Sequence, residues 1–466
     1  MYVRTWNFWL ALWAGKLSGI ILKLLGKKGT TLPGLIAYRL DSSMIKHLAK
    51  AYTEGLIMIT GTNGKTTTAN LLANILTKAG KKFAFNQAGA NLVTGITGAL
   101  LQNTGWRGKA RVRLALLEVD EATVPKFCAE VLPDLVVVTN FFRDQLDRYG
   151  ELDTTIRMVK NALSEKTLLI LNADDPLVAQ FGFERSRVLY YGVARTPESQ
   201  TESQETREAK FCPECGQALD YELFHYGQLG IYACRSCNFK RPDPDVLADQ
   251  VKQQADWLKF KIGSSCYVTA LQGYYNLYNS LAAITVARQL NISEVDIEQG
   301  LREFIPQAGR MERFNFPEGE LTLTLVKNPT GFNQVIRTVL ASGNEVRLLI
   351  ALNDLAADGR DISWLWDVDF ERLGEQAGLV RQVVCSGLRA EEIALRLKYA
   401  GLKLEKLVIE HSLDKAVEIL LSESKKGEVV FALPTYTNLF PLRQLLTARL
   451  KTIPTLVSRN EGAAEK

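Results

Sequence analysis

Apolar and polar positions alternate in blocks along this chain, and the blocks have the lengths of buried strands and of helices. Short apolar runs that end in polar residues are typical of parallel strands, which are buried on both faces. The first such runs cover residues 56–59, 114–120, 135–140 and 167–172. Helix-like stretches at 41–50 and 69–77 lie among them. This alternation predicts an α/β fold with a parallel sheet.

A second pattern of the same kind begins near residue 321. Its strand-like runs cover residues 346–352, 379–385 and 428–433. A chain of 466 residues is too long for one core, so several domains are expected. We predict a helical N-terminal segment (1–50), a central α/β domain (51–314) and a C-terminal Rossmann-like α/β domain (315–466).

The N-terminus is rich in aromatic and aliphatic residues between positions 6 and 25. Lys16 and Lys23 interrupt the run, which leaves fewer than the ~20 apolar residues that a bilayer span needs. No small-residue cleavage site follows, so a signal peptide is not expected. Two interpretations remain: an amphipathic helix docked on the first domain, or contact with a membrane surface through Trp6, Trp9, Trp13 and the lysines. A cytoplasmic location fits both.

Overall composition adds little to this organisation. Hydrophobic residues make up 47% and charged residues 23% of the chain, which are ordinary values for globular proteins. The net charge of +5 is spread over 56 basic and 51 acidic residues, so composition gives no indication of a nucleic-acid-binding protein.

A glycine-containing loop follows the first strand-like run and opens a helix-like stretch, as in nucleotide-binding loops. Its residues are Gly61, Thr62, Asn63, Gly64, Lys65, Thr66 and Thr67. Backbone N–H groups of such a loop close around phosphate oxygens, a lysine contacts the β- and γ-phosphates, and a threonine hydroxyl binds Mg²⁺. We therefore predict an enzyme that uses ATP; the competing interpretation is a chance glycine-rich turn.

Polar side chains follow the next strand-like runs where each one ends. Parallel strands present functional side chains at their carboxyl ends, so Glu118, Asn140 and Asn172 are expected in the same crevice as the loop. Glu118 is the candidate Mg²⁺ ligand. The alternative is an acidic turn in solvent.

Four of the seven cysteines form two Cys-x-x-Cys pairs, Cys212 with Cys215 and Cys234 with Cys237. Two such turns present four thiolates in the tetrahedral arrangement that structural Zn²⁺ prefers, whereas a redox dithiol is the alternative. With no position left for water, the predicted zinc ribbon, at about residues 205–245, is structural. Aromatic residues are expected to cover it: Phe211, Tyr221, Phe224, Tyr232 and Phe239.

The sequence Thr-Gly-Thr-Asn-Gly-Lys-Thr-Thr, at 60–67, is similar to the loop of Mur ligases and folylpolyglutamate synthases. Segments 139–150, 172–176, 273–283 and 309–312 also resemble motifs of these enzymes. The resemblance implies nucleotide contacts for Asn140, Asn172, Asp174 and Asn276, with Asn276 at the adenine. It also implies that Arg310 reaches the γ-phosphate and that Glu118 binds Mg²⁺; helix capping by Asn276 and a solvated Arg310 are the alternatives.

Three segments depart from the Mur ligase pattern. Gln145 replaces a histidine, and Val159 stands where a carbamylated lysine is usual, with Lys160 one residue away. The usual opening of the third domain is replaced by residues 324–331, so the amino-acid-binding domain is expected to be rebuilt.

The inserted cysteine pairs and the segment 352–367 together resemble the MurT family, the synthetase subunits of lipid II isoglutaminyl synthase. This resemblance covers the chain essentially end to end. It implies ATP-dependent amidation of the α-carboxylate of D-glutamate in the lipid II stem peptide, through an acyl phosphate and with ammonia from a GatD-like glutaminase partner. ATP, Mg²⁺ and Zn²⁺ are the expected cofactors, and a peripheral position at the inner membrane face is compatible with a lipid substrate.

The resemblance also implies that the synthetase lends an acid to the glutaminase, where it orients the catalytic histidine. By its place in the motif this acid is Asp361, in preference to Asp354 and Asp358. The alternative is that the three carboxylates only shape a loop.

Two other functions compete with this interpretation. A stand-alone amino-acid ligase of the Mur or folylpolyglutamate class would use the same chemistry with a bulkier nucleophile. A zinc-ribbon scaffold that binds ATP as a regulatory ligand is disfavoured by the presence of both Glu118 and Arg310.

Overall fold

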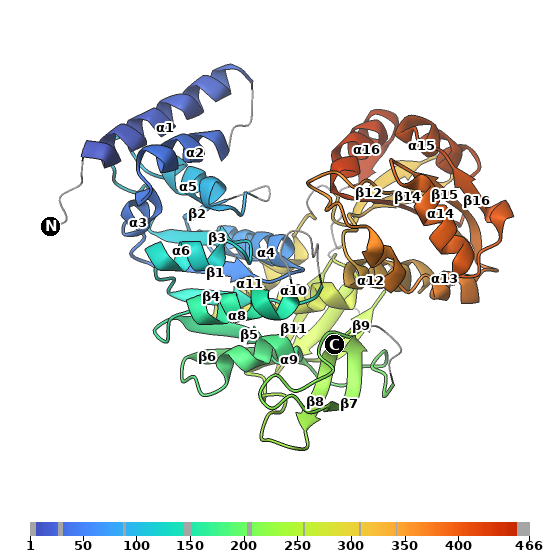
Figure 1. Ribbon diagram of the computed structural model, residues 1–466, viewed down its shortest axis with the longest axis horizontal. Helices are drawn as coiled ribbons and strands as arrows, with labels where there is room; N and C mark the ends of the chain where they lie inside the picture. Colours follow the sequence, from blue (N-terminus) through green and yellow to red (C-terminus); the bar gives the residue numbers. More distant parts are fainter. Residues whose placement is uncertain are drawn as a thin grey trace.

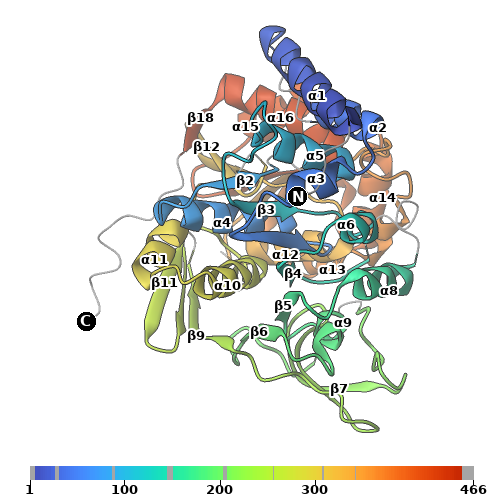
Figure 2. The same ribbon diagram turned by 90° about the vertical axis from the view of Figure 1, so that its left-hand side faces the viewer.

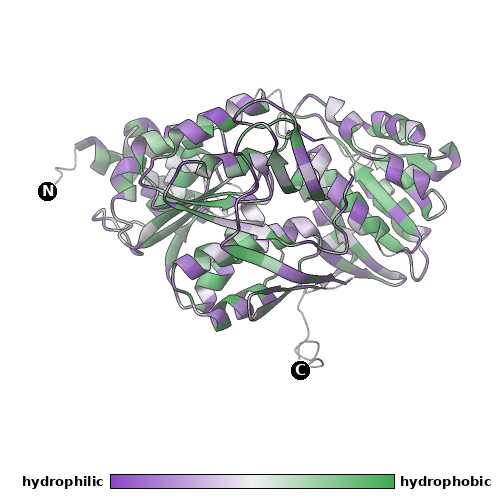
Figure 3. Ribbon diagram, turned by 90° about the horizontal axis from the view of Figure 1, so that it is seen from below, coloured by the Kyte–Doolittle hydropathy of each residue, from purple (hydrophilic) through white to green (hydrophobic). Residues whose placement is uncertain are grey.

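The computed structural model shows two α/β lobes joined along one side (Figure 1). It describes residues 6–26, 31–86, 90–143, 151–202, 207–254, 257–306, 309–341 and 343–453. Each lobe has a central sheet with helices on both faces. Several central strands are strongly hydrophobic, whereas most helices mix hydrophobic and hydrophilic residues (Figure 3).

The sheet of the first lobe is parallel from β2 to β9 and ends in an antiparallel edge formed by β10 and β11. The predicted strands all lie in its parallel part. In sheet order the strands are β11 (Ser265–Thr269), β10 (Leu258–Ile262), β9 (Val246–Gln253), β6 (Val188–Val193), β5 (Leu168–Asn172), β4 (Leu135–Val138), β1 (Gly55–Thr60), β3 (Leu114–Glu118) and β2 (Phe83–Phe85).

Successive residues of the central strands point to opposite faces, so one sheet forms two cores. Ile57 and Ile59 pack against one set of helices, namely α4 (Lys65–Lys78), α10 (Tyr274–Gln289) and α11 (Glu294–Arg302). Leu56 and Met58 pack against the other set. That set comprises α1 (Trp6–Leu24), α2 (Thr31–Leu40), α3 (Met44–Ala49), α5 (Val93–Gln102), α6 (Val124–Glu130) and α8 (Leu152–Ala162).

The N-terminal helix α1 docks on this lobe against α2 and α5. Its buried residues are Phe8, Ala11, Leu12 and Gly15. At Gly15 a Cβ atom would lie 2.6 Å from a side-chain carbon of Leu101 and 3.0 Å from the carbonyl oxygen of Pro33, so glycine favours the close approach of α1 to its neighbours. None of the helices in the described part of the chain has the length and apolar character of a membrane-spanning helix.

The sheet of the second lobe is parallel except at β12 and β18. Its order is β16 (Leu407–Ile409), β15 (Val380–Ser386), β14 (Val346–Ala351), β17 (Val429–Pro434), β13 (Gly319–Leu323), β12 (Glu312–Phe316) and β18 (Lys451–Ile453). One face carries α12 (Pro329–Leu340), α13 (Glu371–Glu375) and α14 (Ala390–Tyr399). The other face carries α15 (Leu413–Ser422) and α16 (Tyr436–Arg449).

A separate antiparallel hairpin, β7 (Leu219–Tyr226) and β8 (Leu229–Cys234), lies at the end of the first lobe farthest from α1 (Figures 1 and 2). It is inserted between β6 and β9 in the sequence. The two Cys-x-x-Cys segments lie at its open end, one before β7 and one at the end of β8. The strands β9 to β11 follow the hairpin and were not predicted, because polar residues stand between the apolar ones in β9 and β10 and leave no continuous apolar run.

Candidate active site

The phosphate loop connects β1 to α4, as predicted, and two of its glycines adopt positive φ angles. Gly61 has φ 116°, and a Cβ atom there would lie 2.4 Å from Thr139 Oγ1. Gly64 has φ 85°, and a Cβ atom would lie 2.1 Å from Asn279 Oδ1. Both positions therefore require glycine. The loop leaves the N-terminus of α4 open towards the cleft, which suits an anion.

The end of β4 holds this loop in place through Asn63. Thr139 Oγ1 donates to the carbonyl oxygen of Asn63 at 2.7 Å, and Asn140 Nδ2 donates to the same oxygen at 3.0 Å. In return, the Asn63 N–H donates to Asn140 Oδ1 at 2.9 Å. Asn140 is thus beside the loop, as expected from its position at a strand end. The rest of the motif at 144–150, including Gln145, lies outside the described residues.

Lys65 is buried and turns back onto its own loop. Its Nζ lies 2.8 Å from Glu121 Oε2 and 3.2 Å from the carbonyl oxygen of Thr62. Burial opposes the charged ammonium, but the negative field of Glu121, Asp120 and Glu118 outweighs it and raises the pKa of Lys65. The lysine therefore stays protonated, with its ammonium paired to Glu121. Sequence reasoning missed Glu121, although it follows Glu118 closely at the same strand end.

A hydroxyl and a carboxylate come together beside the loop. Thr66 Oγ1 donates to Glu118 Oε1 at 3.1 Å. The backbone of Glu118 is fixed by Asn86, which accepts from its N–H at 2.8 Å and donates to its carbonyl oxygen at 2.7 Å. Mg²⁺ is bound by oxygen ligands and, with nucleotides, by one or two protein groups plus phosphate oxygens. The donor set of Thr66 and Glu118 fits such an ion.

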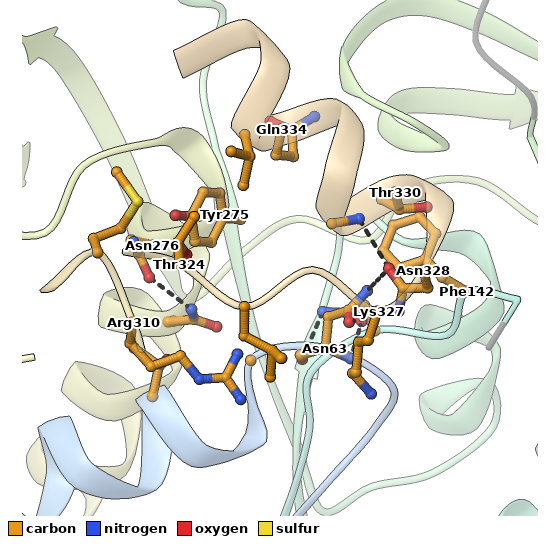
Figure 4. Close-up of a pocket in the computed structure, with 18 of the residues that line it drawn as sticks. Asn63, Phe142, Tyr275, Asn276, Arg310, Thr324, Lys327, Asn328, Thr330 and Gln334 are labelled. Atoms are coloured by element: carbon orange, nitrogen blue, oxygen red, sulfur yellow. Dashed lines mark hydrogen bonds between the residues drawn. The ribbon is translucent and has the colours of Figure 1, made fainter. Parts of the chain in front are cut away.

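A cavity lies between the two lobes, next to the phosphate loop (Figure 4). Arg310, from the connection before β12, and Asn276, from α10, both line it, as do Asn63, Thr67 and Asn140. Burial lowers the pKa of Arg310 while the charge of Glu118 opposes this shift; an arginine nevertheless remains charged near neutral pH. Asn276 does not cap α10, whose N-cap residue is Gly273.

Two candidate residues lie behind the cavity rather than on its wall. Asn172 is buried at the end of β5, where its Nδ2 reaches the carbonyl oxygen of Thr139 at 3.4 Å. Asp174 is also buried and accepts hydrogen bonds from Tyr278 OH and Arg241 Nε, each at 2.6 Å. Neither is among the residues that line the cavity described above. Both brace the strand ends that carry the site.

The second lobe contacts the phosphate loop through Asn328, a contact that sequence reasoning missed. Asn328 Nδ2 donates to Asn63 Oδ1 at 2.9 Å (Figure 4). Asn328 is also the N-cap of α12, because its Oδ1 accepts from the Gly331 N–H at 2.9 Å. The rebuilt segment 324–331 therefore forms one wall of the cavity and joins the two lobes.

The β7–β8 hairpin also reaches this region, which was not predicted. Tyr226 lines the cavity beside Phe142, with ring centroids 6.4 Å apart. Gln228 is buried and its Nε2 donates to the Phe141 carbonyl oxygen at 2.7 Å and to Asp175 Oδ1 at 2.9 Å. The hairpin thus fixes the segment that follows Asn140.

The four predicted cysteines gather at the open end of this hairpin. Their sulfur atoms all lie within 4.8 Å of one another, with Cys212 and Cys237 3.6 Å apart and Cys215 and Cys234 3.5 Å apart. A tetrahedral zinc site with Zn–S bonds of about 2.3 Å has sulfur atoms about 3.8 Å apart, so the cluster fits this ion.

The aromatic cover of the cysteine cluster differs in part from the expectation. Tyr232 and Phe239 stack beside the cysteines with ring centroids 5.8 Å apart. Tyr221 and Phe224 stack on each other at 4.4 Å. Phe211 is 62% exposed and is not among the residues packed around the cysteines, so its expected role was wrong.

The loop after β14 carries the three candidate carboxylates of the second lobe, in different environments. Asp354 is paired with Arg389, 2.5 Å from its Nη2. Asp358 is buried and accepts from the N–H and the hydroxyl of Thr437. Asp361 accepts from the Ser363 N–H at 2.8 Å, and hydrogen bonds from Ser363 lower its pKa. Asp361 is therefore an ionised carboxylate near the surface.

Comparison with known proteins places this geometry in a family. A model of the Mur ligase middle domain matches residues 59–287, and a model of the MurT ligase C-terminal region matches residues 325–439. The chain is 37% identical, over 94% of its length and 97% of the relative's, to the MurT subunit of lipid II isoglutaminyl synthase (glutamine-hydrolyzing) from Staphylococcus aureus. The chain belongs to the MurT family. The corresponding subunit from Streptococcus pneumoniae is 35% identical, again over 94% of this chain and 97% of that one.

Solved structures show the same fold at lower identity. A pseudomurein peptide ligase type C from Methanothermus fervidus is 24% identical, with a TM-score of 0.65 over 86% of this chain and 80% of that chain. MurF ligase from Thermotoga maritima, solved in complex with ADP, is 15% identical, with a TM-score of 0.59 over 88% and 84%. MurT membership and the Mur-ligase-like α/β fold make this chain an ATP-dependent ligase subunit, and ATP and Mg²⁺ are the cofactors of that enzyme class.

Proposed function

We propose that this chain is the synthetase subunit of a lipid II isoglutaminyl synthase. It uses ATP to activate the α-carboxylate of D-glutamate in the lipid II stem peptide as an acyl phosphate. Ammonia then replaces the phosphate, which converts D-glutamate to D-isoglutamine. The observation that carries this proposal is that Lys65, Thr66 and Glu118 gather at the phosphate loop, while Arg310 lines the adjoining cleft and interacts electrostatically with Glu118. The MurT relatives support it by name.

The charges of the site suit phosphoryl transfer to a carboxylate. A carboxylate oxygen attacks the γ-phosphorus and ADP leaves; then ammonia attacks the acyl carbon and phosphate leaves. Lys65 and Arg310 offset the negative charge that develops on the transferring group. Mg²⁺ held by Thr66 and Glu118 would supply a further positive charge at the β- and γ-phosphates.

The remaining candidate residues have supporting roles in this proposal. Gly61, Thr62, Gly64 and Thr67 form the loop around the phosphates, with Asn140 beside it. Asn276 contacts the adenine from α10, while Asn172 and Asp174 hold the strand ends in position. Ammonia needs no amino-acid-binding pocket. This agrees with the loss of the usual third-domain opening motif, in whose place Lys327 and Asn328 line the cavity.

The two larger domains have different tasks in this proposal. The central domain (51–314) performs the ATP chemistry, and the C-terminal domain (315–466) contacts a GatD-like glutaminase. Asp361 completes the catalytic set of that partner, because among the three loop carboxylates it has neither the arginine pairing of Asp354 nor the burial of Asp358. A carboxylate in this role holds a histidine tautomer and stabilises the imidazolium.

Two further parts of the proposal concern metal and location. Cys212, Cys215, Cys234 and Cys237 hold a structural Zn²⁺ in the inserted ribbon, since four thiolates leave no open position for catalysis. The enzyme works in the cytoplasm, peripherally at the inner face of the membrane, where ATP and a lipid-linked acceptor meet.

The proposal is tested by reconstituting the chain with its glutaminase. Lipid II, ATP, Mg²⁺ and glutamine should give amidated lipid II and ADP in equal amounts. Lys65→Ala should slow this reaction by roughly 10²–10³, because one charge-assisted phosphate contact is lost. A product in which an amino acid, rather than the nitrogen of ammonia, is joined to the carboxylate would support a stand-alone ligase and overturn the proposal.

A further inference from the structure

Helix α1 is apolar on two opposite sides, and only one of them is buried. Phe8, Ala11, Leu12 and Gly15 face α2 and α5. At 3.6 residues per turn, six apolar residues lie on the opposite side of the helix, within a sector roughly 80° wide. This outer face consists of Trp6, Leu10, Trp13, Leu17, Ile20 and Leu24.

The outer face is strongly exposed. Trp6 is 77% exposed, Leu17 55% and Leu24 82%. Ile21 and Leu25 extend it, with exposures of 48% and 66%. A continuous apolar stripe of this length on a protein surface marks a contact site, whereas single exposed apolar residues do not.

A second element adds aromatic and basic groups next to α1. Trp106, in the connection between α5 and β3, is 47% exposed, and its carbonyl oxygen accepts from Trp13 Nε1 at 3.2 Å. The ammonium of Lys16 lies 5.6 Å from the centre of the Trp106 ring. Exposed Arg107 and Lys109 follow Trp106 in the chain. Tryptophan and lysine side chains together favour the interface between water and lipid.

The positive charge of the N-terminal segment favours an anionic lipid surface over a second copy of α1 as the occupant of this face. Six of the 56 basic residues and none of the 51 acidic ones lie in the first 40 positions, so the remaining chain, with 50 basic and 51 acidic residues, has a formal charge of −1. A second copy of α1 would bring two segments of the same positive charge close to each other, with no acidic residue among these 40 positions to offset it. An anionic lipid surface complements this charge.

We propose that the outer face of α1, together with Trp106, binds the surface of an anionic lipid bilayer and lies flat on it. The proposal rests on the proposed function for its purpose, since a lipid-linked acceptor has to be met at a membrane. Because the described helices are too short or too polar to span a bilayer, the contact is interfacial and reversible. The helix lies on the first lobe, which also carries the phosphate loop (Figures 1 and 2).

Co-sedimentation with vesicles tests this surface directly. The full chain in complex with its glutaminase is mixed with vesicles of phosphatidylglycerol or of phosphatidylcholine. We expect half-binding at roughly tenfold lower lipid concentration for phosphatidylglycerol, and weaker binding at high salt. The triple variant Trp6→Ser/Trp13→Ser/Leu17→Ser should need roughly tenfold more phosphatidylglycerol than the wild type.

A matched control removes three similarly exposed apolar residues elsewhere on the first lobe. Leu132→Ser/Val295→Ser/Ile305→Ser replaces side chains that are 53%, 72% and 56% exposed, and it should bind vesicles like the wild type. Equal binding by the α1 variant and the control would overturn the proposal, as would absence of wild-type binding. Thermal unfolding of both variants checks that each keeps its fold.

Sedimentation velocity without lipid tests the two other occupants. A wild-type dimer that becomes a monomer in the α1 variant would assign the face to a second copy and overturn the proposal. Loss of the glutaminase complex in that variant would assign the face to the partner and overturn it too.

Amidation assays separate this inference from the proposed function. With lipid II in vesicles the α1 variant should be slowed, and with a short-chain, water-soluble acceptor it should match the wild type. If the wild type amidates neither acceptor, the proposed function fails, whereas vesicle binding still decides the role of α1.

Discussion

Lys65 and Glu121 form a buried ion pair at the base of the phosphate loop, with Nζ 2.8 Å from Oε2 and side-chain exposures of 10% and 8%. The lysine that the sequence assigns to phosphate thus already has an anionic partner within the protein. A nucleotide phosphate would compete with, or join, the carboxylate of Glu121.

Glu121→Gln should therefore make the thermal stability of the protein depend more strongly on bound nucleotide. Removing one member of a buried pair leaves Lys65 charged and poorly compensated, which costs about 3–5 kcal/mol of unfolding free energy. The phosphates of MgATP replace that negative charge, so MgATP should raise the melting temperature of Glu121→Gln more than that of the wild type. Thermal denaturation with and without MgATP measures this difference; equal shifts would show that Lys65 does not meet the phosphates.

Asn328 has two roles that substitution can separate. Serine at this position retains an N-cap for α12 but is too short to bridge to Asn63, whereas alanine loses both. We expect Asn328→Ser to keep the wild-type stability while KM for ATP rises. Asn328→Ala should show the same rise in KM and, unlike the serine variant, a loss of about 1 kcal/mol in stability. Wild-type kinetics in both variants would mean that the contact between the lobes is dispensable.

The cysteine cluster should affect the nucleotide site as well as the ribbon. Cys215→Ser should release about one equivalent of Zn²⁺ and lower the melting temperature. Because Tyr226 and Gln228 of the attached hairpin reach the cavity and the Phe141 backbone, affinity for ATP should fall too. Cys266→Ser, outside the cluster, is the control. A zinc-free wild type, or a variant with full metal and stability, contradicts the zinc assignment.

Asp361→Asn should divide the reaction into its two halves. The substitution keeps the shape but removes the charge that stabilises a partner imidazolium, so glutamine-driven amidation should fall by about 10⁴, as for comparable triad aspartates. Free ammonium should restore the product, and ATP binding should not change. Asp354→Asn is the control for charge loss in the same loop. Full glutaminase activity in Asp361→Asn would leave Asp361 as a loop residue, and failure of ammonium to rescue it would place Asp361 in the synthetase site.

The parts of the site that sequence predicted are the local ones. Gly61, Lys65 and Thr66 stand in one loop whose strand and helix are both visible in the residue pattern. Glu118 follows from the rule that parallel strands present side chains at their carboxyl ends. The paired Cys-x-x-Cys spacing likewise carries its geometry within short turns.

The parts that were not predicted depend on packing between distant segments. Asn63 and Asn328 are 265 positions apart, and no pattern along the chain indicates their contact. Nothing in the sequence around Tyr226 indicates that it lines the cavity, because its place there depends on how the hairpin packs on the first lobe. For α1 the sequence left docking on the first domain and contact with a membrane surface as alternatives. The structure shows that the side with Phe8, Ala11, Leu12 and Gly15 docks and that Trp6 and Trp13 stay exposed.

Oxygen transfer from the acceptor to phosphate tests the central claim most directly. Lipid II labelled with ¹⁸O in the α-carboxylate of D-glutamate is amidated by the complete enzyme, and the inorganic phosphate is analysed by mass spectrometry. An acyl phosphate predicts that one labelled oxygen per amide appears in phosphate, because the carboxylate oxygen bonded to phosphorus leaves with it. Amidation with no label in phosphate, or with label in AMP, would contradict activation of the carboxylate by the γ-phosphate at this site.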